Sequence, residues 1–157
     1  MAVIYVGRDQ EDKQSILGNQ AFAGSPNYSS FVDGLGWGVT VGEGTFHGYA
    51  GGLPQGQPAP YYATADTELI FHVSTLLQGD AQQKMKHIGN DEVHVVWSEN
   101  PKPYRRDVIA TRFCDILIVL HPVSPVLVRV SVETQDPALV FGPLFDGNRP
   151  LTPFIGP

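Results

Sequence analysis

Residues 84–97, KMKHIGNDEVHVVW, bring together the side chains in this chain that are best suited to chemistry on a phosphate. A short basic run turns at Gly89, and an alternating apolar segment follows it. Such a turn would present the amide of Asn90 and the nearby cations to solvent. A carboxamide can accept a hydrogen bond from water through its C=O and donate to a phosphate oxygen through its NH2. The segment has no nucleophile, metal cluster or Gly-rich phosphate loop, so the phosphate would arrive on a partner.

Each of these residues also has a purely structural interpretation. Asn90 follows a glycine, and asparagine is common at the C-terminal cap of a helix. His87 could be half-buried or could interact with the helix dipole. Lys84 and Lys86 could form a solvated helix face, as exposed lysines usually do. Asp91 could orient a water molecule, cap the turn or pair with a lysine. Composition and spacing alone leave these alternatives open.

Other kinds of chemistry have less support in the sequence. Arg105 and Arg106 could act on a phosphate as an arginine finger, but they fall in an expected turn between strands, where exposed cations usually do nothing specific. A zinc hydrolase would need clustered ligands, and the five histidines are scattered over separate segments. The single cysteine, Cys114, excludes an internal disulfide and is predicted to be a buried structural thiol.

Composition places the chain among globular proteins. Its 157 residues are 42% hydrophobic and 17% charged, which suits one domain with a buried core. A net charge of -6 argues against a nucleic-acid-binding protein, which would carry a broad basic face. No apolar stretch reaches the length of a membrane span, and the start, MAVIYV, lacks the features of a signal peptide. We expect a cytoplasmic protein whose strand beginning at the first residues is typical of a piece of a longer chain.

The pattern of apolar residues predicts a mixed α/β fold. Helices are expected where apolar residues recur every three to four positions or where a capping residue precedes an uninterrupted segment, at 11–17, 28–35 and 80–88. Strands are expected at 2–6, 37–41, 61–65, 68–75, 93–97, 116–120 and 126–132. The last two read as nearly continuous apolar strands of a buried sheet. A Gly- and Pro-rich surface loop is expected at 42–60.

Several segments in order resemble one known family. HIGNDEVHVVWSE, then YRRDVIATRFCDILIVLHP and FGPLFDG, are similar to the Rap/Ran-GAP (Rap/tuberin-type) GTPase-activating domains. AVIYVGRDQEDKQSIL, FVDGLGW and PYYATADTELIFHVST agree in the same order. The closest resemblance is to the catalytic alpha subunits of Ral GTPase-activating complexes. It covers residues 1–147 as one domain and leaves 148–157 as a proline-rich tail.

The resemblance implies a single mixed β-sheet flanked by helices, and a residue that acts in trans on a small Ras-like GTPase. In this family an asparagine at the end of a helix, the asparagine thumb, enters the partner's nucleotide pocket, and the matching residue is Asn90. Lys84, Lys86, His87 and Asp91 are then expected to contact the GTPase. The chain would need no cofactor of its own, because the partner holds GTP and magnesium. It would be an activator of the partner's hydrolysis, not a GTP-binding hydrolase.

The same resemblance implies which partners to expect. Ral is the first expectation for the GTPase, with Rap or Rheb as alternatives, and a regulatory beta subunit is a further expected partner. The ending NRPLTPFIGP departs from the family, in which a core strand and a long helix follow, because its prolines break helices. The chain is therefore expected to be truncated and marginally stable. The alternative function is a non-catalytic module that binds a small GTPase or the beta subunit.

Overall fold

The computed structural model describes residues 1–21, 23–44, 46–136 and 138–139. Its elements follow one another as β1 (Ala2–Val6), α1 (Lys13–Leu17), α2 (Pro26–Asp33), β2 (Trp37–Thr40), β3 (Pro58–Ala63), β4 (Glu68–Ile70), β5 (His72–Val73), α3 (Ala81–Ile88), β6 (Val93–Ser98), η1 (Arg106–Ile109), β7 (Ile116–Ser124) and β8 (Leu127–Thr134). Mixed α/β, predicted from the sequence, is confirmed. The FGPLFDG segment at 141–147 and the tail at 148–157 lie outside the described residues.

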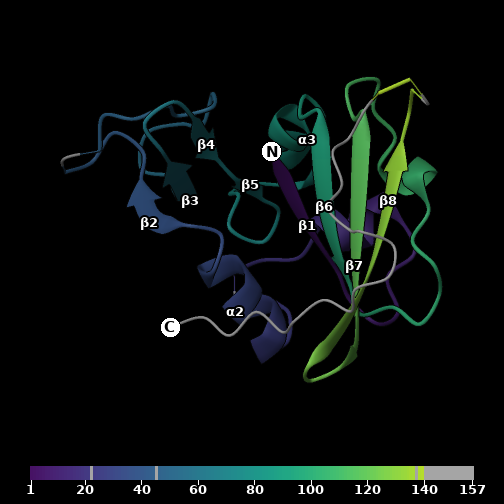
Figure 1. Cartoon of the computed structure of the whole chain (residues 1–157). Coiled ribbons are helices and arrows are strands. Elements are labelled where there is room, and N and C mark those ends of the chain that lie inside the picture. The colour runs from purple at the N-terminus through teal and green to yellow at the C-terminus, as the bar shows by residue number, and fades with distance from the viewer. Residues whose placement is uncertain (22, 45, 137, 140–157) are drawn as a thin grey trace.

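A five-stranded mixed sheet organises the fold (Figure 1), in the order β5-β1-β6-β7-β8. Strand β1 runs parallel to β5 and β6, and β6 runs parallel to β7. Only β8, which forms a hairpin with β7, is antiparallel. The parallel strands therefore share an amino edge, where β1, β5, β6 and β7 begin, and a carboxyl edge, where they end. The turn that carries Asn90 directly precedes β6 and lies at the amino edge.

Different helices cover the two faces of this sheet. Ile16 and Leu17 of α1 and Ile88 of α3 pack in one hydrophobic cluster with Ile4 and Val96. The opposite face carries Trp97 and Val95 in a second cluster with Tyr28 of α2. Strand β6 thus alternates its side chains between two covered faces, as its sequence pattern predicts. Both faces being covered explains why the central strands are almost wholly apolar.

A second, three-stranded antiparallel sheet, β2-β3-β4, was not expected. Figure 1 shows it beside the β5 end of the main sheet. Strand β3 begins inside the segment expected to be a loop, despite Pro58 and Pro60. The carbonyl oxygen of Pro60 accepts a hydrogen bond from the N–H of Phe71. The nitrogen of Pro60, which has no hydrogen to donate, faces the same way and so points away from β2. Ala59 and Tyr61 join the same hydrophobic cluster as Ile4, which packs this sheet onto the main one.

The strand predicted at 126–132 is observed as β8, but the prediction that it is buried is wrong. Strand β8 is the edge of the sheet, and its residues alternate between exposed and half-buried. Val126 and Leu127 at the hairpin are largely exposed. The hairpin turn also lies later than expected, because β7 continues through Pro122 to Ser124 with an irregularity in register there. Proline is tolerated at such an irregular position because the ladder hydrogen bond is already interrupted.

Candidate functional site at the end of helix α3

Helix α3 has well-defined ends. Asp80 caps its N-terminus by accepting a hydrogen bond from the N–H of Gln83 at 2.8 Å, and Gln83 Oε1 accepts from the N–H of Asp80 at 2.9 Å. This reciprocal arrangement is a capping box. At the other end a Cβ on Gly89 would lie 2.7 Å from the carbonyl oxygen of Met85. The N–H of Gly89 still donates to that oxygen at 2.9 Å, so Gly89 closes the last turn of the helix directly before Asn90.

Asn90 is exposed at this helix end. Its Nδ2 donates to the carbonyl oxygen of Lys86, one turn earlier, at 2.8 Å. In the described part of the chain no group hydrogen-bonds to its Oδ1. The side chain therefore caps the last turn through its NH2 group and offers its carbonyl oxygen to solvent. The helix-cap interpretation made from the sequence is therefore observed, and the interpretation as a reactive amide stays a prediction.

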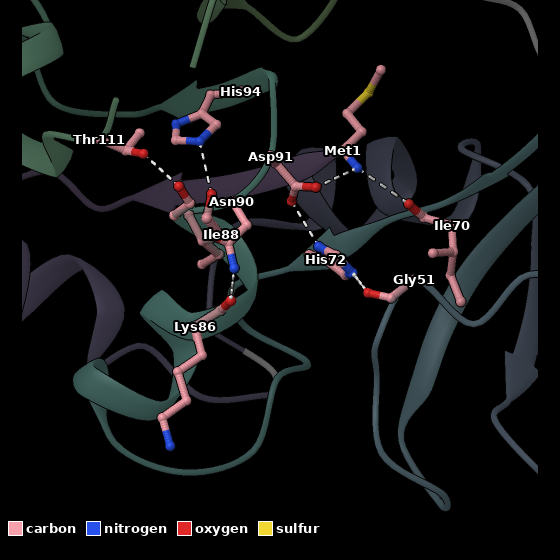
Figure 2. A network of polar contacts seen from close by, with 11 residues as sticks. Met1, Gly51, Ile70, His72, Lys86, Ile88, Asn90, Asp91, His94 and Thr111 are labelled. Carbon is pink, nitrogen blue, oxygen red and sulfur yellow. Dashed lines mark hydrogen bonds and ion pairs between the residues drawn. The ribbon is translucent and has the colours of Figure 1, made fainter. Parts of the chain in front are cut away.

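Four neighbouring segments hold the turn that contains Asn90 (Figure 2). His94 of β6 donates from Nε2 to the carbonyl oxygen of Ile88 at 2.9 Å. Thr111, in the loop that precedes β7, donates its hydroxyl to the carbonyl oxygen of Gly89. Asp91 is held by residues at the start of β1 and β5. Residues 88–91, here called the Asn90 turn, are therefore tied at the amino edge of the sheet to β6, to the loop before β7 and to the starts of β1 and β5.

The carboxylate of Asp91 is used inside the molecule. Its Oδ1 lies 3.0 Å from the amino group of Met1, and its Oδ2 accepts from Nδ1 of His72 at 2.7 Å. The other nitrogen of His72 donates to the carbonyl oxygen of Gly51 at 3.0 Å. Burial acts to raise the pKa of Asp91, but the hydrogen bond from His72 and the charge of the Met1 amino group outweigh it, so the pKa is lowered. Asp91 is ionised and half-buried, with both oxygens engaged.

Lys84, predicted to contact the GTPase, is buried in this structure. Its side chain is fully buried, with 0% of its surface exposed, and Nζ donates to the carbonyl oxygen of Asn19. Burial lowers its pKa. Residues two apart on a helix point about 200° apart, because each residue turns the helix by 100°. Lys86 therefore faces solvent while Lys84 faces the interior, and Figure 2 shows the Lys86 side chain directed away from the turn.

His87 is half-buried, and its ring centre lies 5.5 Å from that of His72. Burial lowers the pKa of His87, and the neighbouring His72 lowers it further, against the opposing effect of Asp91. A pKa below the ordinary value of 6.5 leaves His87 uncharged at neutral pH. It can therefore offer a hydrogen bond at the edge of the turn, whereas Lys86 supplies the exposed positive charge.

The two arginines have structural partners. Arg105 forms an exposed pair with Asp107, with 2.9 Å between Nη2 and Oδ2. Arg106 donates to the carbonyl oxygens of Cys114, Asp115 and Glu133. Arg106 thus joins the loop before β7 to strand β8, which does not favour a role as an arginine finger. Cys114 is buried, as predicted.

The residues that hold the turn were missed in the sequence. Thr111 lies in an irregular loop, and His72 lies in a two-residue strand whose pattern gives no sign of a partner for its side chain. Their contacts with the turn span more than fifteen positions of the chain, so only the pairing of strands brings them there. Among the described residues no group of three or more His, Cys, Asp or Glu side chains could hold a metal ion. No helix within that part of the chain is long and apolar enough to cross a membrane.

Comparison with known proteins gives consistent matches. The sequence profile of the Rap/ran-GAP family matches residues 16–151. A Drosophila melanogaster protein named as a probable Rho GTPase-activating protein is 48% identical over 151 residues, which are 92% of this chain and 8% of that protein. Ral GTPase-activating protein subunit alpha-1 of Homo sapiens is 46% identical over 156 residues, 94% of this chain and 7% of that protein.

A solved structure agrees with these matches. The structure of the TSC2 GAP domain superposes with a TM-score of 0.76 at 32% sequence identity, over 87% of this chain and 80% of that one. The agreement extends to the mixed α/β architecture, so the fold predicted from the sequence is confirmed at this level. The chain spans less than a tenth of the length of the curated relatives quoted above.

Proposed function

The chain belongs to the Rap/ran-GAP family, and on that basis we propose that it accelerates GTP hydrolysis by a small Ras-like GTPase, with Asn90 acting in trans. The observation that carries this proposal is the position of Asn90 at the end of α3. It is an exposed carboxamide whose Oδ1 has no partner among the described residues, in a turn that four neighbouring segments hold in place. The partner supplies GTP and magnesium, and this chain supplies the side chain that completes its active site.

The chemistry required of Asn90 is positioning. Hydrolysis of GTP is limited by placing a water molecule in line with the γ-phosphate and by stabilising charge on the transferred group. Oδ1 of Asn90 would accept a hydrogen bond from that water, and the NH2 group has a second hydrogen available beyond the one donated to Lys86. An arginine finger in other GTPase activators contributes about 10³ to 10⁵ in rate. A fixed carboxamide contributes instead through orientation.

Lys86 and His87 would support docking of the partner. Lys86 is exposed in the last turn of α3, where its charge would attract the phosphate-bearing face of a GTPase. His87, uncharged at neutral pH, would contribute a hydrogen bond rather than a charge. Asp91 would support the turn from inside the molecule and would not contact the GTPase, because both of its carboxylate oxygens have internal partners. Lys84 is excluded from the docking surface in this conformation by its burial.

Ral is the proposed GTPase, with Rap and Rheb as alternatives. Ral GTPase-activating protein alpha subunits are among the relatives of this chain at 45–46% identity. The Drosophila relative carries Rho in its name, so a panel of purified GTPases has to decide between them. A regulatory beta subunit is proposed as a further partner, by the same likeness to alpha subunits.

One observation favours a second candidate function, a binding module without catalytic activity. The NH2 group of Asn90 is already bonded to Lys86, which is what a helix cap alone would require. In that case the chain would dock a GTPase or a beta subunit, and the rate of hydrolysis would not change. The two functions differ in one measurable quantity, the single-turnover rate.

The test is single-turnover hydrolysis of GTP by purified Ral, Rap and Rheb, with and without the chain at saturating concentration. We expect acceleration with one of them, and its loss in Asn90→Ala. Asn27→Ala is a matched control, because Asn27 is an exposed asparagine on α2, away from the turn. Binding without acceleration would establish the second function. Acceleration that survives in Asn90→Ala would remove Asn90 from the mechanism.

A further inference from the structure

The peptide group between Gly89 and Asn90 is held by a residue outside the helix. The hydroxyl of Thr111 donates to the carbonyl oxygen of Gly89, although the two residues lie 22 positions apart in the sequence. The same hydroxyl accepts a hydrogen bond from the N–H of Phe113 at 3.2 Å. Figure 2 shows Thr111 reaching the turn from the side opposite Asp91. Thr111 therefore joins the loop before β7 to the backbone of the Asn90 turn.

This contact bears directly on the direction of the Asn90 side chain. A peptide group is planar, so fixing the carbonyl of Gly89 also fixes the N–H and the Cα of Asn90 in the same plane. Glycine is the residue that least restricts its own backbone. Within the turn the N–H of this peptide donates to the carbonyl oxygen of His87 at 3.2 Å, and the Thr111 hydroxyl adds a second restraint from outside the helix, on the carbonyl side.

The other restraints act on different atoms. His94 holds the carbonyl of Ile88, one residue before this peptide, and His72 holds the side chain of Asp91, one residue after it. The hydrogen bond from Asn90 to Lys86 restrains the side chain but not the peptide plane. Thr111 alone, among the described residues, bonds from a side chain to the peptide that enters Asn90. Its own position is set by the pairing of β7 with β6, in which Ile116 lies opposite Val93.

We propose that Thr111 is a positioning residue for Asn90, acting through the carbonyl of Gly89 and without touching the GTPase. This inference rests on the proposed function, because it assigns Thr111 to the same catalytic side chain. Loss of the hydroxyl leaves the Gly89–Asn90 peptide with only the hydrogen bond from the Asn90 N–H to the carbonyl oxygen of His87, at 3.2 Å, to hold it. The peptide is then less firmly oriented, so Oδ1 of Asn90 spends less time where it can orient water. Misplacement by about 1 Å can cost a factor of about 10² in rate.

The test uses Thr111→Val, which keeps the shape of the side chain but removes the hydroxyl, and Thr111→Ser, which keeps the hydroxyl. We expect Thr111→Val to lower the stimulated single-turnover rate about 10- to 100-fold at saturating chain, with the apparent Kd for the GTPase changed less than about twofold. Thr111→Ser is expected to retain most of the rate. In an Asn90→Ala background, Thr111→Val is expected to have no further effect, since the two residues act as a unit.

Each other outcome is decisive. A normal rate in Thr111→Val, alongside a large loss in Asn90→Ala, overturns the role of Thr111 and leaves the proposed function standing. Equal losses in the Val and Ser variants, or a loss confined to affinity, assign Thr111 a packing or docking role instead. A normal rate in Asn90→Ala overturns both proposals. If Thr111→Val does not fold, Thr111→Ala removes the same hydroxyl without placing a methyl group against the turn, and is judged by the same criteria.

Discussion

The amino and carboxyl edges of the parallel strands both carry asparagines, and they use them differently. At the carboxyl edge Asn19 donates to the carbonyl oxygen of Tyr5 and exchanges hydrogen bonds with Gln10. Asn100 donates to the carbonyl oxygen of Gln10 and accepts from the N–H of Lys102. At the amino edge Asn90 donates one hydrogen bond and keeps its Oδ1 free among the described residues. The carboxamides of the carboxyl edge build loops, whereas that of the amino edge remains available.

This difference is unusual for open sheets with parallel strands, where ligands generally bind at the carboxyl ends. Here the carboxyl edge is closed by Gln10, Asn19 and Asn100, whose amide groups bond to each other and to the backbone. The amino edge instead receives the end of α3. Which edge can act on a partner is therefore decided by the hydrogen-bonding atoms left over after the loops are formed.

The largest expected effect separates the two edges by activity. Asn90→Ala should reduce the stimulated rate of GTP hydrolysis at least about 100-fold, comparable to removing one transition-state hydrogen bond in other enzymes. Asn90→Asp should be no better, because it loses the NH2 donor and adds negative charge beside phosphates. Asn100→Ala, at the carboxyl edge, should leave the saturated rate of the folded protein unchanged. Single-turnover assays measure all three, and a large rate loss in Asn100→Ala would contradict the division between the edges.

The sequence predicted this site in part. The helix end, the glycine and the exposed amide follow from local signals, namely the cap at Asp80 and the turn at Gly89, and all are observed. The burial of Lys84 and the exposure of Lys86 were also readable from helix periodicity, but the interpretation as one basic cluster overlooked this difference. The contacts of Thr111 and His72 could not be predicted, because they depend on the order of strands in the sheet. The strands of the small second sheet were predicted in part, at 37–41, 61–65 and 68–75, but their pairing into a separate sheet could not be read from local patterns. Pro58 and Pro60 also made the start of β3 look like a loop.

The next largest effect concerns stability at the carboxyl edge. There the buried side chain of Lys84 donates a hydrogen bond from its ammonium group to the carbonyl oxygen of Asn19. Lys84→Ala should lower the free energy of unfolding by about 2–4 kcal/mol, because it leaves a cavity and a buried carbonyl without its donor. Lys86→Ala, two residues away, should change it by less than about 0.5 kcal/mol. Urea unfolding compares the two variants, and equal losses would contradict the assignment of Lys84 to the interior.

A smaller effect is expected on the affinity for the partner. Lys86→Ala should weaken binding of the GTP-loaded GTPase about two- to fivefold at low salt, the range of an exposed ion pair. The difference from the unmodified chain should shrink as salt rises, because an exposed charge is screened within about 10 Å at 0.1 M. Arg105→Ala serves as the matched control, since Arg105 is an exposed cation already paired with Asp107. If the Lys86→Ala and Arg105→Ala variants bind the GTPase with equal affinity at low salt, Lys86 has no docking role and is only part of a solvated helix face.

The smallest expected effect is a dependence on pH that only the amino edge should show. Burial lowers the pKa of His94 below its ordinary value of 6.5, and the ring stays neutral in the folded state with Nε2–H donated to Ile88. The unfolded chain then binds more protons than the folded one as pH falls below about 6.5, so stability falls with pH until the lower folded pKa is passed. The carboxamides of the carboxyl edge do not titrate and contribute nothing to this slope.

His94→Gln should flatten that slope, since a glutamine amide can still donate to Ile88 but cannot be protonated in this range. The urea midpoints at pH 7.5 and 5.5 give the slope for each protein. His87 also has a lowered pKa and contributes in the same direction, so His87→Gln measures its share separately. Because His94 is buried and His87 is only half-buried, the larger flattening should come from His94→Gln. An unchanged slope in that variant would mean that the acid sensitivity of the fold arises away from the Asn90 turn.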